Sequence, residues 1–190
     1  MNIRKGKLLY HLTHIDNLES IVKNGLLPRS STNNLIKVDV ANWDILEKRH
    51  NNHLDDFVLF HFHPYTAFDT AVKSTYGPEN FVYITVYREY AERNNFKIVP
   101  RHPLNGEFEI CEYGEGIEKI NWEIMEKTKD MIESNMQSYA KEVKMAECIS
   151  DGIIWPDNFA YIYCNEQYVK ELKRKYPKLA EKIQSQVWLK

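Results

Sequence analysis

The sequence has few of the residues that mark disulfide scaffolds and common cofactor loops. Its three cysteines, Cys111, Cys148 and Cys164, are odd in number and widely spaced, and no CxxC pair occurs. This excludes a disulfide framework, and reduced thiols in a cytoplasmic protein are the simplest account of them. With only seven glycines the sequence contains neither a P-loop nor a GxGxxG motif. The usual phosphate-binding loops are therefore missing.

Long apolar runs and a strong net charge are also missing. The N-terminal segment is charged, and no long apolar stretch follows it, so we expect neither a signal peptide nor contact with a membrane. The formal net charge is −2, which weighs against nonspecific coating of nucleic acid. This balance still leaves room for a local basic groove.

The residues that are present suit one globular domain. A chain of 190 residues with 43% hydrophobic and 13% aromatic residues can bury a sizeable core, and we expect a single domain over residues 1–190. The apolar patterns predict strands at 7–14, 55–64, 81–87, 96–99, 146–150 and 159–164. They predict helices at 18–24, 67–74, 121–134 and 166–176, with short helical stretches at 41–49 and from Pro177. Polar, irregular regions are expected at 29–53 and 100–116. The fold class is α+β.

Local signals set several of these boundaries. Asp16 and Glu19 have the spacing of a capping box at the start of the first helix, and Gly25 is expected to end it. Asn121 and Asn165 are expected to cap two later helices. Trp43, Ile45 and Leu46 are expected to anchor the short helix at 41–49.

Glu147 is a single carboxylate inside the apolar segment 143–149. An ionised carboxylate is costly to remove from water unless a positive or hydrogen-bonding group meets it. The simplest interpretation is an outward-facing residue on a half-buried strand. The alternative is a buried functional carboxylate, whose apolar neighbours would raise its pKa and suit it to act as a general base.

Two other candidate sites are less specific. His61 and His63 lie two apart on one predicted strand, as two zinc ligands would, but no HExxH or Cys/His spacing accompanies them. Cys148 adjoins Glu147, yet adjacent strand residues point to opposite faces, so the two side chains would not cooperate. Neither a metal nor a cysteine nucleophile is expected.

A third constellation runs along most of the chain. Its members, in order, are His11-Leu12-Thr13 on a strand, the helix ending at Gly25, Arg49 in a polar loop, the strand 56–62 before Pro64, and Ala146-Glu147-Cys148. In order and spacing they resemble the DarT family, toxin ADP-ribosyltransferases that modify bases of single-stranded DNA. The resemblance extends from Tyr10 to Tyr168. The chain departs from it at Leu59 and His61, where the family strand usually carries Pro and Tyr.

The resemblance implies an ADP-ribosyltransferase fold like that of poly(ADP-ribose) polymerases, with NAD in a cleft between two β-sheets flanked by helices. It implies that His11 hydrogen-bonds an NAD ribose, that Thr13 lies near the nicotinamide amide, and that Asn17 also contacts the cofactor. Arg49, with Lys48 as the neighbouring alternative, would hold the diphosphate or the acceptor. Glu147 would be the catalytic glutamate, stabilising the ribosyl cation and taking the ring N–H proton of the base.

The function implied is NAD-dependent mono-ADP-ribosylation of a base, thymidine, in single-stranded DNA. NAD would be a co-substrate and no metal would be required. The toxin would be paired with a separate antitoxin protein that carries an ADP-ribose-removing macrodomain. Two alternatives stay open, namely modification of an RNA base and a non-catalytic relative that binds nucleic acid or protein.

Overall fold

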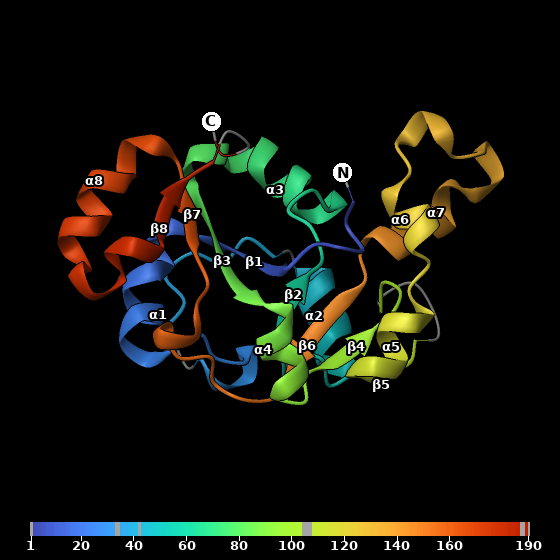
Figure 1. The fold of residues 1–190 in the computed structure, drawn as a ribbon, viewed down its shortest axis with the longest axis horizontal. Coiled ribbons are helices and arrows are strands. Elements are labelled where there is room, and N and C mark those ends of the chain that lie inside the picture. The colour runs from blue at the N-terminus through green and yellow to red at the C-terminus, as the bar shows by residue number, and fades with distance from the viewer. Residues whose placement is uncertain (1, 33–34, 42, 104–107, 187–188, 190) are drawn as a thin grey trace.

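The computed structural model describes residues 2–32, 35–41, 43–103, 108–186 and 189 (Figure 1). The strands are β1 (Leu8–His14), β2 (Val58–His61), β3 (Phe81–Tyr87), β4 (Lys97–Val99), β5 (Cys111–Glu112), β6 (Glu147–Ser150), β7 (Ile162–Cys164) and β8 (Ile183–Ser185). The α-helices are α1 (Leu18–Asn24), α2 (Trp43–Asn51), α3 (Ala67–Tyr76), α4 (Arg88–Arg93), α5 (Tyr113–Lys119), α6 (Trp122–Glu126), α7 (Gln137–Lys144) and α8 (Glu166–Lys175). Within these residues, none of the helices is long and apolar enough to cross a bilayer.

The strands form one mixed sheet in the order β5-β4-β6-β2-β1-β3-β7-β8, and β7 and β8 are its parallel pair. β1 and β3 are in register over their whole length. β1 and β2, in contrast, share a single registered pair, Tyr10 and His61, among the described residues. The two expected sheets are thus the two halves of one sheet, joined at this narrow junction.

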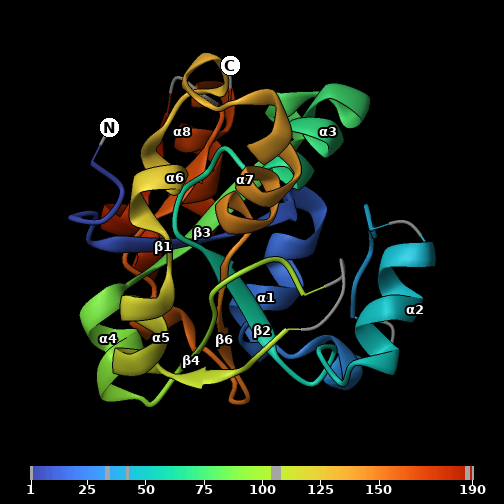
Figure 2. The same ribbon diagram turned by 90° about the vertical axis from the view of Figure 1, so that its right-hand side faces the viewer.

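The two faces of the sheet bury different amounts of apolar surface. The larger core lies on the face that includes Leu9, Phe60 and Cys148, and side chains of α1, α4, α6, α7 and α8 pack into it. The opposite face carries a smaller cluster beneath α3, which includes Val72 and Tyr83. In Figure 2, α2 lies at the periphery, on the other side of β2 from α4 and α5.

Most predicted elements and two of the predicted caps are confirmed. The side chain of Asn121 accepts a hydrogen bond from the backbone of Ile124, and Asn165 accepts one from Gln167. Gly25 ends α1 with φ 82°, a conformation that glycine adopts without steric cost.

Several local predictions are wrong. The Asp16–Glu19 capping box does not form, because His14 accepts the hydrogen bond from the backbone N–H of Asp16. Trp43 does not anchor α2 and is 76% exposed.

The predicted secondary structure also differs from the observed one in three segments. The helix predicted over 121–134 ends at Glu126, and α7 forms further along the chain. The region 100–116 contains β5 and the first residues of α5, while residues 104–107 lie outside the described part of the chain. The strand β8 was not predicted.

Candidate active site

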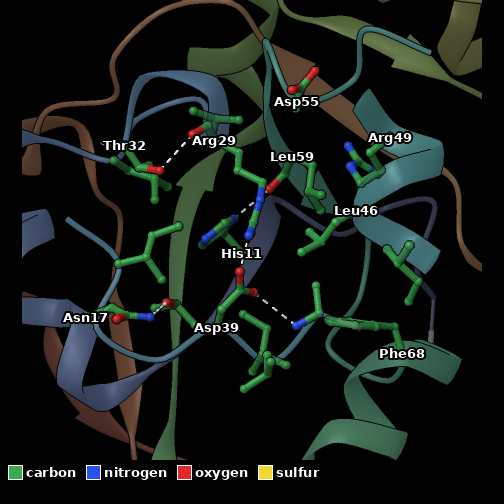
Figure 3. A pocket seen from close by; sticks show the side chains of 18 of the residues that line it. His11, Asn17, Arg29, Thr32, Asp39, Leu46, Arg49, Asp55, Leu59 and Phe68 are labelled. Carbon is green, nitrogen blue, oxygen red and sulfur yellow. Dashed lines mark hydrogen bonds and ion pairs between the residues drawn. The ribbon is translucent and has the colours of Figure 1, made fainter. Parts of the chain in front are cut away.

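A cavity of about 450 Å³ lies where the two halves of the sheet meet. Its walls come from β1, α1, the segments 25–32 and 35–41, α2, β2 and the first turns of α3. Its polar lining includes His11, Thr13, Asn17, Arg49, His61, Asp69, His102 and Glu147. Figure 3 shows His11 and Arg49 reaching towards this space from β1 and α2, with Leu46 and Phe68 among the apolar residues around it. The cavity therefore gathers residues from both ends of the sequence.

Arg49 and Glu147 form a buried ion pair in this cavity. Arg49 Nη1 donates to Glu147 Oε1 at 2.8 Å, and Nη2 lies 3.3 Å from Oε2. The residues are 8% and 2% exposed. The interpretation of Glu147 as an outward-facing surface residue is therefore wrong. Because water is excluded, the two charges interact far more strongly than a surface pair would.

The arginine reaches the pair from a helix and not from the expected polar loop. In α2, Ile45, Leu46 and Arg49 follow the helical repeat and line the cavity, whereas Lys48 is exposed. A further hydrogen bond from Arg49 Nη2 to the carbonyl of Leu54 fixes the guanidinium at the end of the helix. Of the two candidate cations, Arg49 is the one that meets Glu147.

The pKa of Glu147 is lowered, contrary to the raised value expected from its apolar neighbours. Burial alone would raise it, but the nearby charge of Arg49 and the hydrogen bonds from Arg49 outweigh burial. The side chain is thus an ionised carboxylate in a nearly water-free site. Cys148, the next residue, points into the core on the other face as expected, and burial raises the pKa of its thiol.

His11 enters the cavity as a neutral imidazole. Its Nδ1 lies 2.8 Å from the carbonyl oxygen of Leu59, which can only accept, so Nδ1 carries the proton. Burial lowers the pKa of His11 to about 4. The unprotonated Nε2 is therefore a hydrogen-bond acceptor, which suits a ligand hydroxyl group.

The neutral state of the buried histidines predicts a loss of stability in acid. Burial lowers the pKa of both His11 and His63 from 6.5 to about 4. As the pH falls, these histidines become protonated in the unfolded chain before they do in the folded protein. Their contribution to the free energy of unfolding is therefore fully present above pH 6.5 and is lost as the pH falls towards 4. In acid, each histidine should lower the free energy of unfolding by up to about 3 kcal/mol. Urea unfolding at a series of pH values measures this, and His11→Gln should reduce the slope. An unchanged slope in His11→Gln would contradict the assignment.

Thr13 and Asn17 form the floor of the cavity. The amide nitrogen of Asn17 donates to Thr13 Oγ1 at 3.2 Å and to the carbonyl of Val38 at 2.8 Å. Its carbonyl accepts from the backbone N–H groups of Lys37 and Val38. The Asn17 amide is thus used inside the protein, where it holds the segment 35–41 against β1. Next to this segment, the side chains of Arg29 and Asp39 form an ion pair beside His11 (Figure 3).

His61 and His63, the two histidines of the predicted strand 55–64, lie in different surroundings. His61 lines the cavity, and its Nδ1 lies 3.1 Å from the carbonyl oxygen of Ala146. His63 is buried outside the cavity. The described residues contain no cluster of three or more His, Cys, Asp or Glu side chains suited to a metal ion.

Sequence reasoning missed Asp69 and His102 as lining residues and considered His61 only as a metal ligand. Asp69 follows Thr66 by three positions at a helix start, a pattern that normally indicates an exposed capping residue. It is instead 1% exposed, and burial raises its pKa. No local signal in the sequence distinguishes this buried carboxyl group from an ordinary one.

The chain is similar to known proteins in sequence and in fold. Residues 10–188 match the profile of the family described as "ssDNA thymidine ADP-ribosyltransferase, DarT". No curated protein sequence gives a significant match.

Among solved structures, Thermus sp. 2.9 DarT in complex with ADP-ribosylated ssDNA aligns with a TM-score of 0.75 and 21% identity, over 94% of this chain and 90% of its own. The NAD+ complex of the same Thermus protein aligns with a TM-score of 0.74 and 19% identity, over 97% and 98%. Thermosipho africanus DarTG in complex with ADP-ribose aligns with a TM-score of 0.75 and 22% identity, over 92% of this chain and 48% of its own. These likenesses confirm the ADP-ribosyltransferase fold, and with the profile match over nearly the whole sequence they show that the chain belongs to the DarT family of ssDNA thymidine ADP-ribosyltransferases.

Proposed function

We propose that this chain transfers ADP-ribose from NAD to thymidine in single-stranded DNA, with Glu147 and Arg49 at the catalytic centre. The observation that carries the proposal is the buried, two-point ion pair of these residues inside the cavity that also contains His11. A cavity of about 450 Å³ lies within the usual size range of small-molecule sites. NAD is the proposed co-substrate, and no metal takes part.

Glu147 stabilises the positive charge that develops as the bond between nicotinamide and ribose breaks. Such a ribosyl cation is oxocarbenium-like, and a fixed carboxylate in a water-poor site stabilises it without reorganising solvent. Arg49 keeps Glu147 ionised, and its planar guanidinium also suits the NAD diphosphate or an oxygen of the acceptor base.

His11 and Thr13 position the NAD. The Nε2 atom of neutral His11 is an acceptor for a ribose hydroxyl, which is consistent with its Nδ1 being tied to Leu59. Thr13 is 8% exposed and also lines the cavity, and we assign its hydroxyl group to the nicotinamide amide. Asn17 is a positioning residue that shapes the wall formed by the segment 35–41.

Asn17→Ala should raise the KM for NAD about tenfold and change kcat less. The substitution removes three hydrogen bonds to Lys37 and Val38, together worth about 3 kcal/mol. If about half of this loss reaches the NAD site, the remaining ~1.4 kcal/mol is a factor of ten in affinity. Asn17→Asp is the matched control, because it keeps the acceptor for both N–H groups and loses the donor. Its KM should lie between the other two. A wild-type KM in Asn17→Ala would show that this wall does not shape the NAD site.

The proposed activity is tested by incubating the protein with NAD and a mixed set of single-stranded DNA and RNA oligonucleotides, followed by mass spectrometry. We expect one added ADP-ribose on thymidine-containing DNA strands and none on the same strands annealed into duplexes, because a paired base does not expose its ring edge. If only RNA is modified, the protein is still an ADP-ribosyltransferase, but its substrate is RNA and not DNA. If nothing is modified and NAD does not bind, the protein is a non-catalytic relative.

We further propose that residues 1–190 form a single ADP-ribosyltransferase domain that acts as the toxin of a toxin–antitoxin pair in the cytoplasm. The three cysteines are buried and free, in keeping with a reducing compartment. The antitoxin is a separate protein with a macrodomain that removes ADP-ribose. Expression in a bacterial host should arrest growth, Glu147→Gln should not, and co-expression of such a macrodomain should restore growth. Growth unaffected by the active protein would refute the toxin role.

A further inference from the structure

We propose that His61 accepts the ring N–H proton of the acceptor thymine, while Glu147 acts only on the ribosyl cation. This inference rests on the proposed function and divides its chemistry between two side chains. In antiparallel register His61 lies directly opposite Glu147, so both side chains project from the same face of the sheet. Both line the cavity. The imidazole is therefore next to the carboxylate that contacts the ribose.

The hydrogen bond of His61 determines which ring nitrogen is available to a substrate. Its Nδ1 lies 3.1 Å from the carbonyl oxygen of Ala146, which can only accept, so Nδ1 carries a proton. In the neutral ring the lone pair is then on Nε2. Within the described part of the chain, Ala146 supplies the only hydrogen bond of this ring. Nε2 is thus the ring nitrogen of His61 that is left for a substrate, and the carbonyl of Ala146, just before Glu147, fixes the orientation of the ring.

Glu147 is the less suitable base. Both of its oxygens face Arg49, at 2.8 and 3.3 Å, and its pKa is held low although burial alone would raise it. The strength of a general base falls as its pKa falls, so a carboxylate held in this way gains little by taking a proton. The same properties favour a permanent negative charge, which is what the ribosyl cation requires.

The surroundings of His61 contain both signs of charge. The titratable groups around it are His11 from β1, Arg49 from α2, His63 beyond the end of its own strand, Asp69 from α3, His102 after β4 and Glu147 from β6. Burial opposes ionisation of Asp69 and Glu147, whereas a positive charge on His61 favours it. The attraction is mutual, so these two carboxyl groups stabilise the imidazolium that forms, against the opposing charge of Arg49.

The proposed step balances as follows. The bond between C1′ of the ribose and the nicotinamide nitrogen breaks, and its electron pair leaves with neutral nicotinamide. In thymidine N1 bears the sugar, so the ring N–H is at N3. The N3 atom forms the new bond to C1′, and its proton moves to His61 Nε2. The imidazolium returns the proton to water after the product leaves.

His61→Asn tests the proposal, because the asparagine amide can still donate to Ala146 while the Nε2 position is lost. We expect transfer to thymidine to fall about 10²- to 10⁴-fold, the usual contribution of a general base. NAD binding and the slow hydrolysis of NAD to ADP-ribose and nicotinamide should fall far less than transfer. His63→Asn is the matched control on the same segment, outside the cavity, and should keep full transfer.

A second substrate makes the test independent of small changes in the fold. When thymidine is replaced by 5-fluorodeoxyuridine, whose N3 proton is more acidic, the deficit of His61→Asn should shrink, and it should shrink again as the pH is raised. A variant that modifies thymidine at the wild-type rate overturns the proposal, as does a deficit that is equal for both bases. Loss of NAD hydrolysis together with transfer would also overturn it. If the wild-type protein itself modifies no thymidine, the proposed function fails instead.

Discussion

Glu147→Gln should lower the rate of ADP-ribosyl transfer by about 10³-fold, with little change in NAD binding. The two side chains have the same shape, and glutamine retains an oxygen that can accept from Arg49 Nη1. What is lost is the negative charge opposite the developing ribosyl cation, which matters only in the transition state. The kcat should therefore fall much more than the KM rises.

The assay should be run well below the melting temperature of the variant, because Arg49 is left without its counter-ion. Circular dichroism then confirms the fold, and single-turnover mass spectrometry measures the rate. Glu133→Gln, on the exposed surface, is the matched control and should keep wild-type activity. A Glu147→Gln protein that transfers at the wild-type rate would refute the assignment of the catalytic centre.

Arg49→Met should lower the free energy of unfolding by about 3–5 kcal/mol, because it leaves Glu147 as an unpaired charge in the core. Glu147 is 2% exposed, so water cannot solvate its carboxylate in place of the arginine. The double variant Arg49→Met/Glu147→Gln should recover much of this stability, because no buried charge remains. Urea unfolding of the wild type, both single variants and the double variant gives the coupling energy directly.

The ion pair of Arg49 and Glu147 also predicts how the difference in stability between the wild type and Arg49→Met depends on pH. The folded pKa of Glu147 is lowered, despite the opposing effect of burial, so the pair contributes stability above the pKa of an unfolded glutamate. This contribution is lost as the pH falls through the folded value. The gap between the wild type and Arg49→Met should therefore narrow in acid. A gap that is constant with pH would mean that the arginine acts through packing alone.

Local patterns in the sequence were sufficient for elements whose signals lie within a few residues. Phe81–Tyr87 is a strand because all of its residues are β-branched or aromatic. Asn165 begins α8 because its side chain accepts a hydrogen bond from the backbone of Gln167, two positions away. Ile183–Ser185 has one apolar residue and becomes a strand only because β7 lies beside it. α7 was missed because only Ala140 and Val143 of its side chains are buried.

In the candidate site, too, local sequence signals identified some residues, whereas contacts between distant residues could not be predicted. Glu147 and His11 could be singled out from their positions along the chain, but the pKa of Glu147 depends on Arg49, which lies 98 positions away. The sequence alone suggested a raised pKa, since it contains the apolar neighbours and not the contact. His61 was noticed as half of a His-x-His pair. Only the register of β2 with β6 shows that it faces Glu147.

The order of the strands also decides when activity appears during synthesis of the protein. β6 inserts between β2 and β4, although it is made long after both of them. Until the ribosome has released it, β2 and β4 have no common neighbour and Glu147 is missing from the cavity. Pairing across such long separations is slow compared with local folding. A chain that ends before β6 is therefore inert, so a cell that makes this protein is exposed to its chemistry only after β6 has been synthesised and released.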